Sequence, residues 1–262
     1  VRIQSQSGQL HYGLLQPDYS VHVLDAPPWL QGQETDVVLT AETYQLMAPC
    51  APSKIVAVGK NYAAHAAEME GGLPQEPLLF MKPSTAVTAH MAPILYPPQS
   101  QRVDYEGELA LVMGDRCVDC SEAEAGEKIW GYTIANDVTA RDLQRQDSQW
   151  IRAKGFKSFR PLGPWIVREL NPEAQIQTML NDGESPVQVG AISDMIFKPE
   201  MLVAYISQIM TLLPGDVILT GTPEGVGPLQ IGDRVRIKIE GIGALENRVQ
   251  ARIQPAVPIN KA

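Results

Sequence analysis

Residues 103–113 have the sequence VDYEGELALVM and predict a buried β-strand that carries two acidic side chains at its start. The apolar run of residues 109–113 is typical of such a strand. Side chains two residues apart on a strand point to the same face, so Glu106 and Glu108 are expected side by side. Neighbouring carboxylates resist burial unless a positive group lies between them, and Mg²⁺, Mn²⁺ or Ca²⁺ is the simplest such group. The alternative is an exposed strand end with two solvated glutamates.

The composition is that of an ordinary folded protein. Of 262 residues, 44% are hydrophobic and 19% are charged, as in typical globular domains. Lys plus Arg number 21 and Asp plus Glu number 30, so the net charge is −9. This balance argues against nucleic acid or an anionic membrane as the main partner. We find no apolar run of the ~18 residues that a membrane span requires and no secretory signal, and we therefore expect a cytoplasmic protein.

Three cysteines, Cys50, Cys117 and Cys120, agree with a reducing compartment. Cys117 and Cys120 have the CxxC spacing of redox and zinc sites. The chain has no second CxxC to complete a zinc site, and the pair lacks the βαβ context of a thioredoxin-like motif. We interpret the two as incidental thiols of a loop.

The sequence predicts two domains. Residues 1–48 contain short alternating runs separated by turn sequences, which predicts a small β-rich N-terminal domain. Its expected strands lie at residues 2–4, 10–15 and 20–24. Residues 49–262 form the larger, second domain. There the amphipathic pattern of residues 199–212 predicts the clearest helix, with its apolar side chains in the core.

A candidate general base lies on the helix predicted for residues 63–69. His65 and Glu68 are three residues apart and so share one face of that helix. A carboxylate beside an imidazole fixes its tautomer and raises its basicity, as a general base requires. The alternative is a polar pair on the surface. Gly71 and Gly72 follow and suggest the hinge of a mobile lid.

A third carboxylate, Asp137, comes at the end of the strand predicted for residues 129–137 and at the start of a helix. Helix capping is the alternative role for Asp137, because the first turn of a helix favours a carboxylate. Arg141 and Gln144 lie one turn further on. They share a face and are placed to reach an anionic ligand.

Two further segments carry polar residues whose roles the sequence leaves open. The glycine-rich loop 221–228 contains Thr222 and lacks the signature of a nucleotide-binding loop, which leaves a tight turn or a cradle for a small carboxylate. Lys154 lies in the positively charged run of residues 152–160, a pattern typical of a solvated loop. Lys82 ends an apolar strand and is interpreted as a side chain that extends to the surface.

Taken together, these segments resemble the fumarylacetoacetate hydrolase family. The likeness covers the chain from about residue 50 to its end, in the family's order, and is carried by His65, Glu68 and residues 58–62, 80–84, 104–109, 136–144, 154–156, 161–165 and 214–225. Residues 1–48 resemble the small, variable N-terminal domain of many members. The family's large eukaryotic hydrolases take an additional aspartate ligand that we do not find here. The chain therefore resembles the smaller, three-carboxylate type, such as acylpyruvate hydrolases and oxaloacetate decarboxylases.

The resemblance implies a fold of the α+β class, mainly β, in which the catalytic domain is a mixed β-sandwich roll, and it implies a homodimer. It implies a Mg²⁺ or Mn²⁺ ion bound by Glu106, Glu108 and Asp137. It also implies that Lys154 supports the site and that the general-base pair is His65 and Glu68. The residues that it places near the substrate are Arg141, Gln144 and Thr222.

From these residues we expect divalent-metal-dependent cleavage of a C–C bond in a small 2-oxo acid through a metal-bound enolate. The two forms of this reaction that we expect first are acylpyruvate-type hydrolysis and oxaloacetate decarboxylation. A tautomerase or isomerase of 2-oxo acids, such as oxaloacetate or 2-hydroxy-diene-dioates, uses the same enolate and remains an alternative. The alternative from another class is a non-catalytic, metal-stabilised binding protein, which has no need of a base such as His65.

Overall fold

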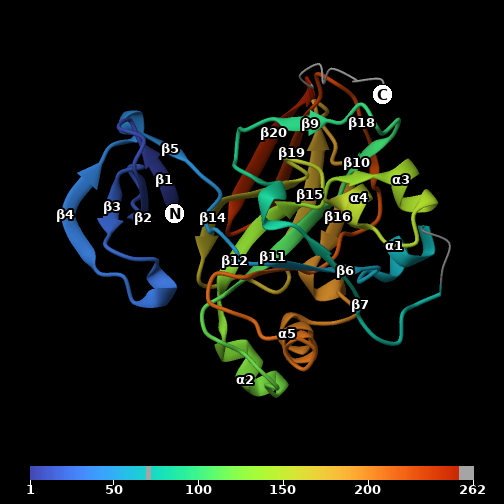
Figure 1. Ribbon diagram of the computed structural model, residues 1–262, viewed down its shortest axis with the longest axis horizontal. Helices are drawn as coiled ribbons and strands as arrows, with labels where there is room; N and C mark the ends of the chain where they lie inside the picture. Colours follow the sequence, from blue (N-terminus) through green and yellow to red (C-terminus); the bar gives the residue numbers. More distant parts are fainter. Residues whose placement is uncertain (69–71, 254–262) are drawn as a thin grey trace, which may run out of the picture.

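A computed structural model of the chain describes residues 1–68 and 72–253, and these form four β-sheets joined by short helices. Figure 1 shows a small sheet on one side and a larger body that holds the other three sheets. The fold is mainly β with short helices, as predicted. None of the helices in the described residues is long and apolar enough to span a membrane.

The small sheet is built from the first part of the chain. Its strand order is β4-β3-β2-β1-β5. The strands are β1 (Arg2–Ser5), β2 (Leu10–Leu15), β3 (Val21–Leu24), β4 (Glu34–Leu39) and β5 (Tyr44–Leu46). The short 3₁₀ helices η1 (Pro28–Leu30) and η2 (Ala41–Thr43) connect them. Trp29 of η1 belongs to the same buried cluster as Ile55 and Leu219 of the larger body, so the two parts share a core.

The largest sheet has seven strands in the order β7-β6-β17-β11-β12-β14-β8. They are β6 (Ile55–Gly59), β7 (Leu78–Lys82), β8 (Val87–Thr88), β11 (Gly107–Met113), β12 (Ile129–Asn136), β14 (Arg160–Val167) and β17 (Val217–Leu219). Every residue of β11 is buried, which explains its continuous apolar sequence, because a strand covered on both faces has no polar face. Strand β11 is therefore the centre of the fold, as its sequence predicts.

Two further sheets complete the larger body. A five-stranded sheet has the order β16-β15-β19-β20-β9, and a three-stranded sheet has the order β13-β10-β18. Their strands are β9 (Ile94–Tyr96), β10 (Val103–Tyr105), β13 (Thr139–Ala140), β15 (Gln175–Leu180), β16 (Gln188–Ala191), β18 (Gly227–Leu229), β19 (Arg234–Ile239) and β20 (Gly243–Ala251). Leu109 of β11, Ile176 of β15 and Ile237 of β19 lie in one buried cluster, which places the main core between the two large sheets.

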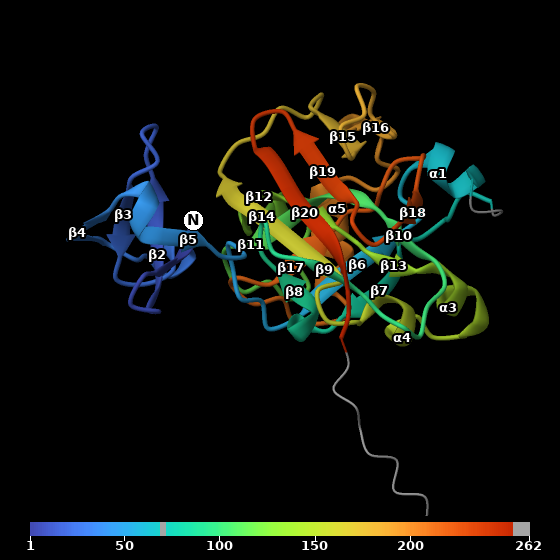
Figure 2. The ribbon, with the colours of Figure 1, turned by 90° about the horizontal axis from the view of Figure 1, so that it is seen from above.

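The helices are short and lie at the edges of these sheets. They are α1 (Ala63–Glu68), α2 (Glu122–Glu127), α3 (Arg141–Gln146), α4 (Ile151–Lys154) and α5 (Pro199–Ser207), with the 3₁₀ helices η3 (Ser84–Ala86) and η4 (Ile192–Asp194). Both views place α1, α3 and α4 together on the side of the body away from the small sheet (Figures 1 and 2). This grouping brings residues from two separate parts of the chain, 63–68 and 141–154, to the candidate site.

Helix α5 is shorter than its sequence pattern predicts. The apolar spacing extends to residue 212, but the helix ends at Ser207 and Ile209 is 57% exposed. The reason is a competing backbone pairing, because Leu212 and Cys117 exchange two hydrogen bonds of 3.0 Å. The prediction was therefore right for residues 199–207 and wrong for residues 208–212.

The two CxxC cysteines lie close together in the structure. Cys117 and Cys120 have their Cα atoms 6.1 Å apart, a separation that a disulfide can span. Cys50 is free and buried.

Candidate active site

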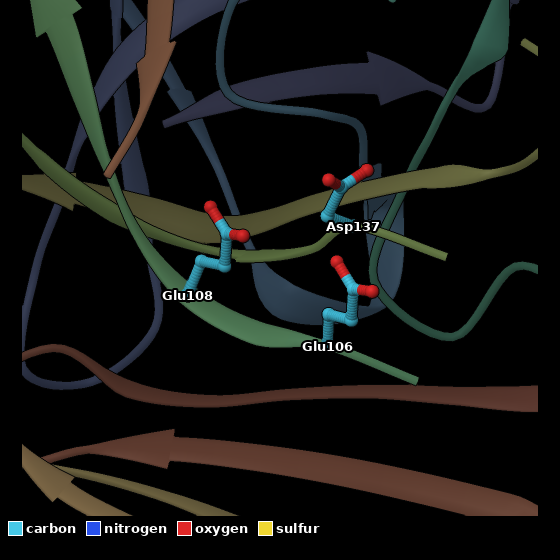
Figure 3. Close-up of side chains that lie close together, drawn as sticks. All are labelled: Glu106, Glu108 and Asp137. Carbon is cyan, nitrogen blue, oxygen red and sulfur yellow. The ribbon is translucent and has the colours of Figure 1, made fainter. Parts of the chain in front are cut away.

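Three buried carboxylates meet where β11 and β12 pair. Gly107 lies opposite Asn136 in the antiparallel ladder, and the Asp137 N–H donates to the Glu106 carbonyl at 2.8 Å. This pairing places Asp137 beside Glu106 and Glu108 although some thirty residues separate them in sequence. One carboxylate oxygen from each of the three lies within 4.8 Å of the others. Figure 3 shows the three side chains gathered at one point.

Two buried lysines hold Asp137. Lys154, at the end of α4, places its Nζ 2.6 Å from Asp137 Oδ2 and 2.9 Å from Glu106 Oε2. Lys82, at the end of β7, donates to Asp137 Oδ1 at 2.5 Å and also to the carbonyls of Val138 and Phe159. Burial by itself raises the pKa of Asp137, but Lys154 and Lys82 outweigh it and hold this pKa below its usual value. Asp137 is therefore held as a carboxylate.

Arg141 holds the other side of Glu106. Its guanidinium donates to Glu106 Oε1, to Asp104 Oδ2 at 2.9 Å and to Gln144 Oε1 at 2.6 Å. Burial again opposes ionisation, but Lys154 and Arg141 together lower the pKa of Glu106. Each of the three nitrogens of Arg141 thus contacts a protein acceptor, which positions Glu106, and two of its five N–H groups remain for a ligand in the cavity.

Glu108 has a different environment. Among the described residues its carboxylate accepts one hydrogen bond, from the Gly221 N–H at 3.0 Å. Burial raises its pKa well above the usual value, and the negative charges of Asp137 and Glu106 raise it further. A cation at this point relieves that repulsion. Three carboxylates within 4.8 Å are a hard, oxygen-only donor set, which suits Mg²⁺, Mn²⁺ or Ca²⁺. The residues present therefore fit a divalent metal ion.

His65 and Glu68 form a pair on α1. His65 is buried, and its Nδ1 lies 3.1 Å from Glu68 Oε2. The second oxygen of Glu68 accepts the Gly225 N–H at 3.3 Å, which ties the pair to the glycine-rich loop. With Nδ1 facing a carboxylate, the proton lies on that nitrogen and Nε2 keeps a lone pair. The suggested lid hinge involves Gly71, which lies outside the described residues.

A cavity of about 210 Å³ connects these groups. Eight of the nine site residues that the sequence selects line it, and the ninth, Glu68, lies behind His65. The lining residues are Val58, Gly59, Lys60, His65, Phe80, Glu106, Glu108, Asp137, Arg141, Gln144, Arg145, Trp150, Lys154 and Thr222.

Thr222 is held by a side chain that the sequence gave no reason to select. Its hydroxyl donates to the Gly107 carbonyl at 2.8 Å and accepts from Gln188 Nε2 at 2.9 Å. Gln188 is buried, and its Oε1 accepts the Gly107 N–H at 3.0 Å. The hydroxyl proton of Thr222 is therefore used in the hydrogen bond to the Gly107 carbonyl. Thr222 still lines the cavity, and that wall position is where a residue near the substrate is expected.

The sequence analysis did not predict the burial of two further cations. Lys82 does not extend to the surface, because only 1% of it is exposed, and burial lowers its pKa to about 8 in spite of Asp137. Arg160 of β14 is fully buried, and within residues 1–68 and 72–253 none of its guanidinium nitrogens has a hydrogen-bond partner. The sequence does not show whether a lysine or arginine at the start or end of an apolar strand is buried or exposed.

Comparisons with known proteins agree with this geometry. Residues 54–250 match the family model described as fumarylacetoacetate (FAA) hydrolase C-terminal, and residues 1–49 match one described as Rv2993c-like, N-terminal. The chain is 41% identical over 209 residues to the mitochondrial oxaloacetate tautomerase of Arabidopsis thaliana, covering 78% of this chain and 93% of the relative.

Two solved structures extend the comparison. The 5-carboxymethyl-2-hydroxymuconate delta-isomerase from Mycobacterium smegmatis superposes with a TM-score of 0.88 at 44% identity, covering 96% of this chain and 98% of that one. The fumarylpyruvate hydrolase from Pseudomonas aeruginosa, in complex with Mn²⁺ and pyruvate, superposes with a TM-score of 0.72 at 33% identity, covering 83% and 93%. Relatives with this fold are therefore enzymes of the tautomerase, isomerase and hydrolase types, and one of them binds Mn²⁺.

Proposed function

Because the chain belongs to the fumarylacetoacetate hydrolase family, we propose that it cleaves a C–C bond of a small 2-oxo acid with the help of Mg²⁺ or Mn²⁺. The reaction is acylpyruvate-type hydrolysis, oxaloacetate decarboxylation or both. The observation that carries the proposal is the meeting of three buried carboxylates with His65 on the wall of one cavity. A purely structural role explains neither the burial of Glu108 next to two other carboxylates, which raises its pKa, nor the presence of His65 on the wall of the same cavity.

Glu106, Glu108 and Asp137 are the residues that would hold the metal ion. When bound, the ion would supply a Lewis acid that polarises the carboxylate and 2-oxo oxygens of the substrate and stabilises negative charge on them. Lys154, Lys82 and Arg141 keep Glu106 and Asp137 ionised, so that these two ligands carry negative charge at neutral pH. Phe80 and Trp150 line the same cavity and exclude water from part of it.

His65 is the residue that moves a proton. Its Nδ1 faces Glu68, so Nε2 accepts a proton from a water molecule that attacks the distal carbonyl of an acylpyruvate. Glu68 stabilises the imidazolium that forms, and the Gly225 N–H keeps Glu68 in place. The bond beyond C3 then breaks, and its electron pair remains on the pyruvate fragment as an enolate, which takes up a proton. Decarboxylation of oxaloacetate yields the same enolate with loss of CO₂ and needs no water attack.

A second candidate is a tautomerase or isomerase of 2-oxo acids. It is favoured by the names of the relatives, an oxaloacetate tautomerase at 41% identity and a muconate delta-isomerase at 44%. In that reaction His65 Nε2 removes a proton from C3 and returns it to another atom, and no bond between carbons breaks. Both candidate reactions use the same carboxylates and the same base, so they are distinguished by assays with defined substrates.

We also propose that the protein acts as a homodimer on a small molecule, with neither nucleic acid nor a membrane as partner. The division into domains of residues 1–48 and 49–262 and the cytoplasmic location likewise remain predictions.

The test is a substrate panel with oxaloacetate, acetylpyruvate and fumarylpyruvate, each with Mg²⁺, Mn²⁺ or EDTA. Three readouts separate the reactions: CO₂ release, loss of the acylpyruvate absorbance, and conversion between the keto and enol forms of oxaloacetate. Glu106→Gln should abolish turnover, whereas the exposed Glu240→Gln, a matched loss of one carboxylate, should not change it. Turnover that survives EDTA would remove the metal ion from the mechanism.

A further inference from the structure

Asp104 is a fully buried carboxylate beside the candidate site that does not line its cavity. It lies on β10, and both of its oxygens accept from guanidinium groups. Arg102 Nε donates to Asp104 Oδ1 at 2.9 Å, and Arg141 Nε donates to Asp104 Oδ2 at 2.9 Å. Arg102 is exposed, whereas Arg141 is buried at the cavity wall. Asp104 therefore joins a surface cation to a cation of the site.

Asp104 also belongs to a chain of ion pairs in which positive and negative groups alternate. Each carboxylate of this chain lies between two cations, and only the first member of the chain is exposed to solvent. The members are, in order, Arg102, Asp104, Arg141, Glu106, Lys154, Asp137 and Lys82. A change at Asp104 therefore reaches Glu106 through a single intermediate, Arg141.

Asp104 is the acceptor that can fix the direction of the Arg141 side chain. Arg141 has two other acceptors: Glu106 is itself a proposed metal ligand, and Gln144 is an uncharged residue of the same helix. Asp104 is charged, buried and on a separate strand, and charge-assisted hydrogen bonds are about twice as strong as neutral ones. The backbone keeps the two residues close, because β10 pairs with β13 and the Arg141 N–H donates to the Arg102 carbonyl at 2.8 Å.

We propose that Asp104 is a positioning residue that holds the Arg141 guanidinium against Glu106 and directs its two remaining N–H groups into the cavity. This rests on the proposed function, because it takes Glu106 as a metal ligand and the cavity as the place of the 2-oxo acid. Asp104 contacts neither the metal ion nor the 2-oxo acid and acts on both through Arg141. Asparagine cannot replace it, because the amide NH₂ takes the position of one carboxylate oxygen and turns a donor toward a guanidinium.

The test measures binding rather than turnover. Titration calorimetry gives the dissociation constant of Mn²⁺ for the protein and that of pyruvate, a small 2-oxo acid, for the Mn²⁺-loaded protein. Asp104→Asn should weaken pyruvate binding about tenfold, the size of one charge-assisted contact, and Mn²⁺ binding about 10–100-fold, as changes beside metal ligands do. Arg102→Gln is the matched control. It removes the other partner of Asp104, leaves Arg141 paired, and should change both constants by about twofold or less, as expected for an exposed ion pair.

A double-mutant cycle identifies the route of the effect. In an Arg141→Gln background, Asp104→Asn should have little further effect on pyruvate binding, because the residue through which it acts is gone. An equal loss in both backgrounds would show that Asp104 acts by another route and overturns the proposal. A folded Asp104→Asn protein that binds Mn²⁺ and pyruvate as the wild type does also overturns it.

If Asp104→Asn does not fold, its combination with Arg102→Gln replaces it, because the glutamine can accept from the asparagine NH₂. Compared with Arg102→Gln alone, the neutral amide should still weaken pyruvate binding severalfold, and equal binding overturns the proposal. Wild-type protein that binds Mn²⁺ and pyruvate but turns over no substrate of the panel refutes the proposed reaction and leaves the positioning role standing. Wild-type protein that binds neither overturns both.

Discussion

Replacing Gln188 tests how the five-stranded sheet supports strand β11 and the glutamates at its start. Gln188 lies on β16, and its amide makes four hydrogen bonds of 2.9–3.0 Å, to the Gly107 N–H, Thr178, Thr222 and the Pro223 carbonyl. Gln188→Met keeps the volume and removes all four. The threonine hydroxyls can rotate to other partners, but the Gly107 N–H and the Pro223 carbonyl lose the bonds that Gln188 provides.

Each buried backbone group left unsatisfied costs about 1–3 kcal/mol, so we expect Gln188→Met, which leaves two such groups, to lower the free energy of unfolding by about 2–6 kcal/mol. For a chain of this size that corresponds to a fall in Tm of roughly 4–24 °C. Gly107 separates Glu106 from Glu108, so metal affinity should also fall, by about 10–100-fold as for other residues that support metal ligands. Urea denaturation and Mn²⁺ titration measure the two effects.

Gln175→Met is the control, because Gln175 is exposed on the neighbouring strand β15 and bonds a surface glutamine. It should unfold within about 0.5 kcal/mol of wild type, as surface substitutions usually do. A Gln188→Met protein that is as stable as this control and binds Mn²⁺ normally would refute the support that we assign to Gln188.

Three further predictions concern the base, a buried lysine and a helix start. His65→Gln should reduce acylpyruvate hydrolysis by about 10²–10⁴-fold and oxaloacetate decarboxylation much less; equal losses in the two assays would contradict its role as base. Lys82→Met should cost about 3–5 kcal/mol because Asp137 loses a buried partner, whereas the half-exposed Lys128→Met should cost about 1 kcal/mol or less in denaturant titrations. Burial opposes the ionisation of Asp142, but hydrogen bonds from a backbone N–H and a serine hydroxyl lower its pKa. Its stabilisation is therefore present above the ordinary pKa of aspartate and is lost as the pH falls through the lowered value; the difference in Tm between wild type and Asp142→Asn should shrink on acidification, and a constant difference would argue against it.

The sequence predicts those features of the fold that depend on local pattern. The apolar run of β11 is buried along its whole length. The i, i+3 spacing of His65 and Glu68 places them in contact on α1. Each of these patterns depends on residues of a single strand or helix, where the backbone period decides which side chains share a face. No distant segment competes for the backbone hydrogen bonds of these elements.

What the sequence does not predict depends on partners that are distant in the chain. Helix α5 ends early because Leu212 pairs with Cys117, some ninety residues away. The sequence does not distinguish Gln188 from other glutamines on strands. Its role follows only from the position of β16 beside Gly107. Lys82 ends an apolar strand as many surface lysines do, and only the pairing of β11 with β12, which brings Asp137 to it, explains its burial.

The charges around the site explain why a metal ion and a dianionic ligand belong together. Eight charged side chains are buried there, four acidic and four basic: Asp104, Glu106, Glu108 and Asp137, with Lys82, Arg141, Lys154 and Arg160. If all eight are ionised, their charges cancel. A divalent cation added to this balanced set leaves two positive charges in a buried region, where uncompensated charge is costly. A monoanionic ligand removes one of them and a dianion removes both, so the dianion and the metal ion should strengthen each other's binding.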